Sequence, residues 1–180
     1  MDPDVQQAAA FHGHMCPGLA IGVRAARYGL REIGPHAQDE EVVALVETDM
    51  CAVDAIQSLM GCTFGKGNLI HKDYGKSAFT FYRRSDGKGM RLVTRPDAPG
   101  LRDPAQEEIG KQRRSDEILA RAEDELFRIE PVASRPPQPA RIHASLVCED
   151  CGESTMETRT RRFGARALCI PCFERADVRT

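Results

Sequence analysis

Four cysteines near the C-terminus restrict the fold of this chain more than any other feature of its sequence. They form two Cys-x-x-Cys pairs, Cys148/Cys151 and Cys169/Cys172, and seventeen residues separate the pairs. Each pair can form a tight turn that presents two thiolates, and two such turns complete a tetrahedron around one zinc ion. Four cysteine ligands leave no open coordination position, so the sequence predicts a structural zinc that supplies folding free energy to a small module.

The segment between the two pairs, and the residues that follow it, indicate the secondary structure of the module. Its pattern predicts a hairpin from residues 155–160 and 162–168, followed by a terminal helix that begins near Pro171. This order is typical of a treble-clef or zinc-ribbon module. The arginines at positions 159, 161, 162 and 166 fit a nucleic-acid contact, a solvated face, or a face that docks on an acidic partner subunit. Because few aromatic residues accompany them and the net charge of the chain is -2, we do not expect a nucleic-acid partner.

A proline-rich segment separates this module from the rest of the chain. Residues 131–141 contain four prolines and indicate an extended linker between a core domain at 1–130 and the zinc module at 142–180. Seven cysteines, an odd number, argue against a closed disulfide framework and favour a reducing compartment. We find neither an apolar stretch of membrane-spanning length nor a secretory signal. The sequence therefore predicts a cytoplasmic protein without a membrane partner.

Apolar periodicity predicts that the core domain is α+β, with helices packed on a mainly antiparallel sheet. The expected helices span residues 3–11, 19–33 and 51–60. The expected strands span residues 41–47, 68–74, 78–84 and 90–94, with a hairpin turn at 85–89. Pro96, Pro99 and Pro104 form a kink before a predicted charged helix at about 105–130, for which Ser115 is a candidate N-cap.

The core domain carries a second concentration of residues suited to metal or thiol chemistry. His12, His14 and Cys16 lie within five residues, directly before a predicted helix, and imidazole and thiolate ligands suit borderline-soft metals. Residues two apart share a face in extended backbone. We therefore expect His12, His14 and Cys51 to bind zinc or another transition metal, with Cys16 and Cys62 nearby. An open fourth position would make this a catalytic type of site.

Several residues of these segments are candidates for catalysis: Cys51, His14, Cys16, Asp49 and Lys66. Cys51 lies where a predicted strand ends and a helix begins, and backbone amides at such a position favour the thiolate. Asp49 or Asp54 would orient a ligand, and Lys66, between two glycines, suits an anionic group.

Each of these residues also has a purely structural interpretation, which the sequence leaves open. The cysteines can be small buried side chains. His12 and Asp49 can cap helices, and Lys66 can be a solvated turn residue.

Three motifs occur in order and carry a family resemblance. They are His12-Gly13-His14-Met15-Cys16-Pro17-Gly18, the segment 47–57 with Thr48-Asp49-Met50-Cys51, and the segment 61–69 with Gly65-Lys66-Gly67-Asn68, followed by Lys72-Asp73-Tyr74-Gly75-Lys76. Together they resemble the formylmethanofuran dehydrogenase E-subunit family, over most of residues 11–95. The resemblance implies an α+β core, a homodimer, a His/Cys site in a cleft and a C-terminal zinc finger.

Three functional hypotheses follow. The resemblance implies a metal-binding accessory or subunit-like protein beside the molybdenum or tungsten enzyme that reduces carbon dioxide to formylmethanofuran, or in related one-carbon metabolism. The site residues also fit a stand-alone enzyme that uses a metal-bound water or the Cys51 thiolate. A third alternative is a protein whose zinc module binds nucleic acid or another partner.

Overall fold

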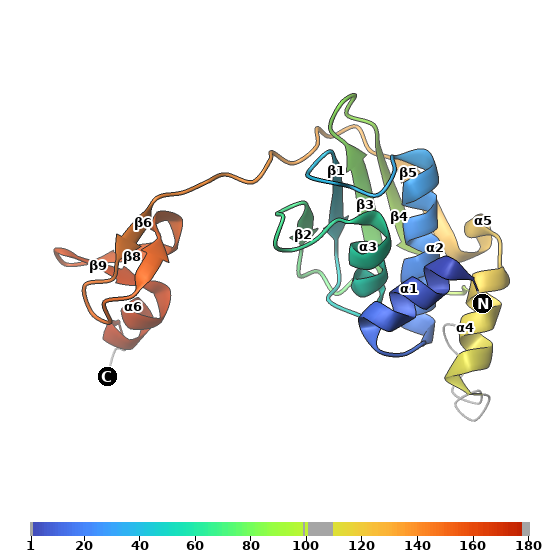
Figure 1. The fold of residues 1–180 in the computed structure, drawn as a ribbon, viewed down its shortest axis with the longest axis horizontal. Helices are drawn as coiled ribbons and strands as arrows, with labels where there is room; N and C mark the ends of the chain where they lie inside the picture. The colour runs from blue at the N-terminus through green and yellow to red at the C-terminus, as the bar shows by residue number, and fades with distance from the viewer. Residues whose placement is uncertain (1, 99, 101–109, 178–180) are drawn as a thin grey trace. The chain divides into compact units, whose positions relative to one another are not determined.

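The protein divides into two units, Met1–Ala140 and Arg141–Thr180. The computed structural model describes residues 2–98, 100 and 110–177 (Figure 1). Figure 1 shows one layer of helices in front of a sheet in the first unit, and a small set of strands with one helix in the second.

The sheet of the first unit has five strands in the order β2-β1-β3-β4-β5. The strands are β1 (Val42–Val46), β2 (Leu69–His71), β3 (Ala78–Arg83), β4 (Gly89–Thr94) and β5 (Phe127–Pro131). β2 runs parallel to β1, and the other three pairings are antiparallel. The predicted fold class, helices on a mainly antiparallel sheet, is thereby confirmed.

Among the described residues of this unit, five helices accompany the sheet: α1 (Pro3–His12), α2 (Pro17–Glu32), α3 (Ala52–Met60), α4 (Lys111–Ala120) and α5 (Glu123–Leu126). Asp2 caps α1 by accepting hydrogen bonds from the backbone amides of Asp4 and Val5. Side chains of α2 and α3 such as Leu19, Ile21, Ile56 and Met60 are buried in one cluster with Phe79, Phe81 and Leu92 of the sheet. None of the described helices is long and apolar enough to cross a membrane.

The contact between α2 and α3 is unusually close because glycines of α2 face the other helix. A Cβ placed on Gly22 would lie 2.3 Å from the carbonyl oxygen of Ala52, at the start of α3. A Cβ on Gly18 would lie 3.3 Å from the Cβ of Cys51. The absence of side chains at these two positions lets the N-terminal ends of both helices approach each other.

The region after β4 differs from the prediction of one long helix at about 105–130. Residues 99 and 101–109, which include Pro99 and Pro104, lie outside the described residues. Helix α4 ends at Ala120, and residues 127–131 form strand β5, in which Ile129 pairs with Leu92. The backbone groups of β4 are satisfied by this pairing, which a helix could not provide. Ser115 lies inside α4, where its hydroxyl donates to the Lys111 carbonyl, so it is no N-cap.

The predicted strand at 68–74 is also shorter, since β2 contains only Leu69–His71. From there the chain turns back toward the end of β1. The amides of Lys72 and Lys76 donate to the carbonyls of Val46 and Glu47. The loop at 72–76 therefore lies beside the segment that leads from β1 to Cys51.

The second unit contains two hairpins, and the predicted pairing of 155–160 with 162–168 is wrong. Its elements are β6 (Ser145–Val147), β7 (Ser154–Met156), the 3-10 helix η2 (Glu157–Arg159), β8 (Thr160–Phe163), β9 (Arg166–Cys169) and α6 (Ile170–Ala176). β6 pairs with β7 and β8 pairs with β9. The tight turn of Cys148 and Cys151 reverses the chain, so residues 154–156 pair backward across that turn. The predicted terminal helix is confirmed as α6.

Gly22→Ala should destabilise the first unit, because the added methyl group would overlap backbone rather than a movable side chain. Overpacking of this kind costs about 1–3 kcal/mol, which exceeds the helix-propensity gain of about 1 kcal/mol for replacing glycine. Urea unfolding should show a lower midpoint at unchanged m-value. The control is Gly65→Ala, whose added Cβ meets nothing within 4 Å. Equal midpoints for the two variants would contradict the close α2–α3 contact.

Candidate functional site

Three residues from separate segments of the first unit meet in one group. A ring nitrogen of His12 and the Sγ atoms of Cys16 and Cys51 all lie within 4.8 Å of one another. His12 ends α1, Cys16 is the N-cap of α2, and Cys51 directly precedes α3. The group therefore lies where the C-terminal end of one helix meets the N-terminal ends of two others.

Local backbone structure explains how the short segment 12–16 supplies two members of this group. Gly13 ends α1 with a left-handed φ of 93°, a conformation that glycine adopts without strain. The chain then turns into extended backbone, and the Sγ of Cys16 accepts a hydrogen bond from the Leu19 amide at 3.4 Å. The distance from Cys16 Sγ to His12 Nε2 is 4.0 Å.

A carboxylate orients the imidazole of His12. Asp54 Oδ2 lies 2.7 Å from His12 Nδ1, so a proton on Nδ1 leaves Nε2 as the free nitrogen on the side of Cys16. The Gln57 side-chain amide in turn donates to Asp54 Oδ1 at 3.4 Å. A carboxylate that holds the second ring nitrogen in this way is the usual companion of a metal-binding histidine.

The group is largely shielded from solvent, but Cys51 remains partly accessible. Cys16 is buried, the side chain of His12 is 13% exposed, and Cys51 is half-buried. Burial, together with the neighbouring Cys16 thiol, raises the pKa of Cys51 above its ordinary value. One nitrogen and two sulfurs at such distances suit a tetrahedral metal, for which adjacent sulfurs lie about 3.8 Å apart at a bond length of about 2.3 Å. The residues present therefore fit a zinc-like ion with a fourth position left for another ligand.

His14 is not a member of this group, although the sequence favoured it over Cys16. Extended backbone from His12 to His14 would have placed both imidazoles on one face. Instead, His12 belongs to a helix, and the turn at Gly13 leaves His14 exposed. Its ring lies 4.7 Å from that of His12, centroid to centroid. Cys16 is the third member of the group because it caps α2 from inside the protein.

Three further predicted residues lie apart from the group or play other parts. The Lys66 ammonium donates to the Ala37 carbonyl at 2.8 Å, so it holds a loop rather than facing an anion site. Cys62 is completely buried, and burial raises its pKa to about 12. Asp49 is exposed, and no side chain caps α3, so its predicted capping role is not observed. Of the two acids considered for orienting a ligand, Asp54 contacts His12.

Sequence reasoning overlooked Gln57 and an apolar rim. Gln57 lies three residues after Asp54 on α3, a spacing that places both on one helix face, so the signal was present. The large exposed apolar residues of the described first unit are Phe11, Met50, Phe64 and Tyr74. Phe11 and Met50 directly precede His12 and Cys51, and the Phe64 amide donates to Gln57. Phe11 and Met50, and Phe64 through Gln57, therefore place exposed apolar side chains near the group.

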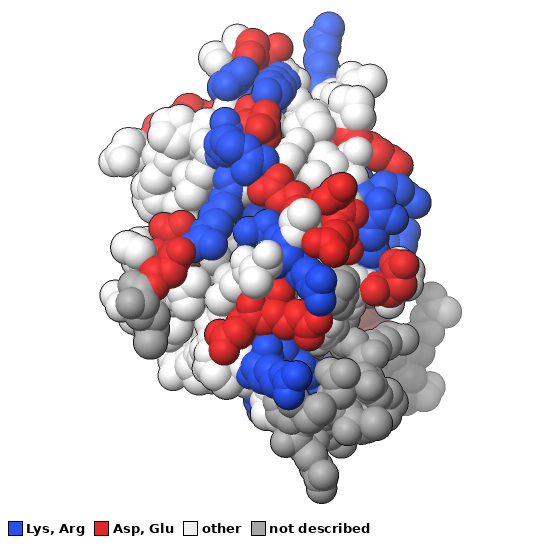
Figure 2. Space-filling view, turned by 90° about the vertical axis from the view of Figure 1, so that its right-hand side faces the viewer, with Lys and Arg blue, Asp and Glu red and all other residues white. Residues whose placement is uncertain are grey.

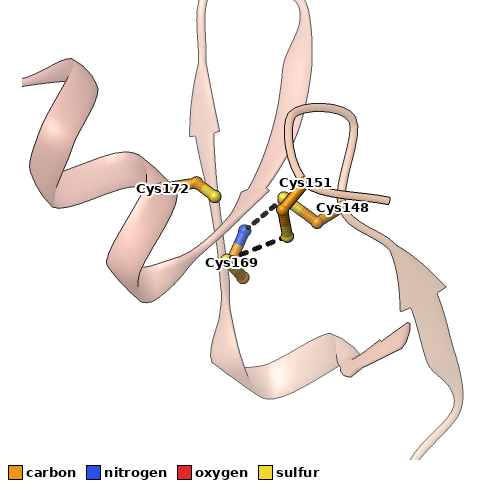
Figure 3. A group of neighbouring side chains, drawn as sticks. All are labelled: Cys148, Cys151, Cys169 and Cys172. Carbon is orange, nitrogen blue, oxygen red and sulfur yellow. Dashed lines mark hydrogen bonds between the residues drawn. The ribbon is translucent and has the colours of Figure 1, made fainter. Parts of the chain in front are cut away.

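The second unit contains the predicted group of four cysteines, Cys148, Cys151, Cys169 and Cys172. Figure 3 shows that two come from the turn after β6, one from the end of β9 and one from α6. The Sγ atoms of Cys151 and Cys169 lie 3.9 Å apart, close to the spacing of two ligands on one zinc. The Cys169 amide donates to Cys148 Sγ at 3.3 Å and lowers the pKa of Cys148 to about 6, which favours the thiolate.

Comparison with known protein families matches both units. Residues 142–177 match the prokaryotic dksA/traR C4-type zinc finger, which together with the cysteine group supports zinc binding by the second unit. In solved structures, the chain is similar to a protein from Syntrophus aciditrophicus that is described as like FmdE, the E-subunit of tungsten formylmethanofuran dehydrogenase. The TM-score is 0.70 at 23% identity, over 97% of this chain and 92% of the other, which shows a shared fold.

Among curated proteins, a relative from Archaeoglobus fulgidus is named a probable S-adenosyl-L-methionine-binding protein. It is 32% identical over 193 aligned residues, which cover 92% of this chain. The alignment covers only 51% of the relative, so this chain spans about half of that protein's length. Residues 11–132, more than half of the chain, match the model described as FmdE, molybdenum formylmethanofuran dehydrogenase operon. The chain therefore belongs to the FmdE family.

Proposed function

We propose that this protein is a metal-binding accessory or subunit-like component of molybdenum or tungsten formylmethanofuran dehydrogenase, or of related one-carbon metabolism. The observation that carries the proposal is the group of His12, Cys16 and Cys51, with Asp54 holding the outer nitrogen of the imidazole. A structural core does not need two thiols and an oriented imidazole within 4.8 Å of one another.

The ligand set defines the metal by its chemistry. One nitrogen and two sulfurs suit zinc or another borderline-soft transition metal rather than magnesium or calcium. Three protein ligands leave one tetrahedral position for water or a substrate atom, as in catalytic zinc sites. The half-buried Cys51 lies on the accessible side, so we place the open position there.

The association with the dehydrogenase is supported by the family description, which refers to the enzyme's operon, and by the name of the Syntrophus aciditrophicus protein. Our proposal includes a cytoplasmic homodimer, for which the exposed Phe11, Met50, Phe64 and Tyr74 offer apolar surface. It does not include S-adenosylmethionine, because the chain spans about half of the relative with that name.

A second candidate function is a thiol-dependent enzyme without a metal in the first unit. The observation in its favour is that Cys16 and Cys51 lie side by side and Cys51 is accessible. In that case Cys51 would be the nucleophile and Cys16 its neighbouring thiol.

Metal content separates these two functions. The full-length protein, purified without added metal, should contain about two zinc or other transition-metal ions per chain, as measured by elemental mass spectrometry. Replacing Cys169 and Cys172 by serine should remove one ion, and Cys16→Ser with Cys51→Ser should remove the other. Cys62→Ser is the matched control, because Cys62 is not in the group. A wild-type chain with a single ion, lost only in the Cys169/Cys172 variant, would favour the thiol enzyme.

Asp54→Asn should weaken metal binding at the first unit without unfolding it. Removing a carboxylate that orients a histidine ligand typically lowers metal affinity about 10- to 100-fold. Competition with a chromogenic chelator measures this affinity in a chain that also carries the Cys169→Ser and Cys172→Ser changes. Asp49→Asn is the control, since Asp49 is an exposed acid near Cys51 that does not contact His12. Equal affinities for the two variants would show that Asp54 does not support the ligand.

Alkylation of native protein at pH 8 should distinguish the thiols of the first unit. With its pKa raised to about 12 by burial, Cys62 is thiolate in about one molecule in ten thousand at this pH. Cys51 also has a raised pKa but is accessible, so iodoacetamide should label Cys51 far faster than Cys62 in metal-free protein. Added zinc should protect Cys51. Peptide mass spectrometry reads both sites, and rapid labelling of Cys62 would contradict its burial.

A further inference from the structure

The second unit contains a continuous basic stretch around one of its hairpins. Residues 158–167 include Arg159, Arg161, Arg162 and Arg166 and contain no aspartate or glutamate. These residues form the end of η2, strand β8, the turn at Gly164 and the start of β9. All four arginines are exposed. We call this set of four arginines on the β8–β9 hairpin the arginine ribbon.

Most of the ribbon's charge is not neutralised within the protein. Arg166 Nη1 lies 3.8 Å from Asp150 Oδ1. The other three arginines, Arg159, Arg161 and Arg162, form no ion pair with any residue that the structure describes. Within the described part of the chain, the side chains of Arg159 and Arg161 donate to the neighbouring Thr158 and Thr160. Two acidic side chains of this unit have other partners, since Glu149 accepts from the Ala167 amide and Glu157 lies 3.6 Å from His143.

Many charged side chains of the first unit are paired with an opposite charge. Figure 2 shows acidic and basic side chains interleaved over one face of the molecule. Typical pairs in the first unit are Arg31 with Glu123 and Arg121 with Glu117. Three neighbouring arginines without such partners concentrate positive charge on this hairpin, which the net charge of -2 for the whole chain conceals.

The ribbon is also held in a fixed conformation. Phe163 pairs with Arg166 across a two-residue turn, in which Gly164 has a left-handed φ of 60°. The Phe163 ring packs edge-to-face against Phe173 of α6, and Cys169 at the end of β9 belongs to the cysteine group. Arg162 stands opposite Ala167, whose small side chain leaves the guanidinium uncovered. Little backbone ordering remains to oppose binding of a partner.

We propose that the arginine ribbon binds the phosphate backbone of duplex nucleic acid without reading its sequence. Exposed guanidinium groups match phosphates in charge and geometry, and a two-stranded ribbon has dimensions that fit a groove of the duplex. Single strands are bound chiefly by stacking of bases on exposed aromatic rings. Phe163, the one aromatic residue in the stretch 158–167, is packed against Phe173 and is not free to stack on a base. The surface therefore suits a duplex. This binding activity is separate from the metal chemistry proposed for the first unit.

Salt dependence of duplex binding tests the proposal. The full-length, zinc-loaded protein is titrated into a fluorescein-labelled DNA duplex of mixed sequence, and anisotropy is followed from about 50 to about 200 mM KCl. Three phosphate contacts predict a slope of log K against log salt near -2.7, hence an affinity loss of about 40-fold over this range. The triple variant Arg159→Gln, Arg161→Gln, Arg162→Gln should lose most of the affinity and bring the slope close to zero.

Three controls make the result decisive. The variant Arg159→Lys, Arg161→Lys, Arg162→Lys keeps the charge and should retain most of the slope. The variant Lys111→Gln, Arg113→Gln, Arg128→Gln removes the same charge from exposed positions of the first unit and should bind like wild type. Zinc content of every variant confirms that the second unit is folded.

Several outcomes would overturn the proposal. They are no duplex binding by wild type, equal losses in the two glutamine variants, or polyglutamate binding as strong as DNA binding. The last result would identify an acidic protein as the partner instead.

Discussion

The close contact between α2 and α3 is the constraint on which the candidate site depends. Cys16 and Cys51 are 35 positions apart in sequence, and each stands at the N-terminal end of one of these helices. Their sulfurs can bind the same metal ion only if the N-terminal ends of the two helices nearly touch. Gly18 and Gly22 permit this approach, since a side chain on Gly22 would overlap the backbone of Ala52. Residues that bind nothing thereby determine whether the site exists.

The electrostatics of the helix ends suit a metal held in this way. At the N-terminal end of α2, the Leu19 amide donates to the Cys16 sulfur, and an amide in this position favours a thiolate ligand. His12 lies at the C-terminal end of α1, where partial negative charge accumulates, and Asp54 adds a full negative charge on the same imidazole. The contact with Asp54 orients the ring so that its other nitrogen lies toward Cys16, as in histidines that bind a metal. The contacts at the ends of α1 and α2 therefore favour the same bound state.

The core elements could be predicted from the sequence where periodicity was strong, as in α2, β1 and β3. The members of the candidate site could be predicted only in part, for physical reasons that particular residues illustrate. Which of His14 and Cys16 faces inward depends on where α1 ends, and Gly13 fixes that boundary with one positive φ. Lys66, between two glycines, resembled a residue that binds an anion. Its actual partner, the Ala37 carbonyl, is distant in sequence, so no local pattern indicates it. Likewise, β5 is a strand because β4 needs a partner, which no local pattern expresses.

Local charge in the second unit also differs from the net charge of the chain. A total of -2 sums over residues that the fold separates or pairs, whereas a binding partner meets only the local field. The cysteine group affects the local electrostatic field at the arginine ribbon indirectly, by determining which strands pair. The turn at Cys148 and Cys151 lets β6 pair with β7, which leaves β8 and β9 to pair with each other and display their arginines. Four thiols bound to one ion would hold both hairpins, so the ion that stabilises this unit would also fix the spacing of its charges.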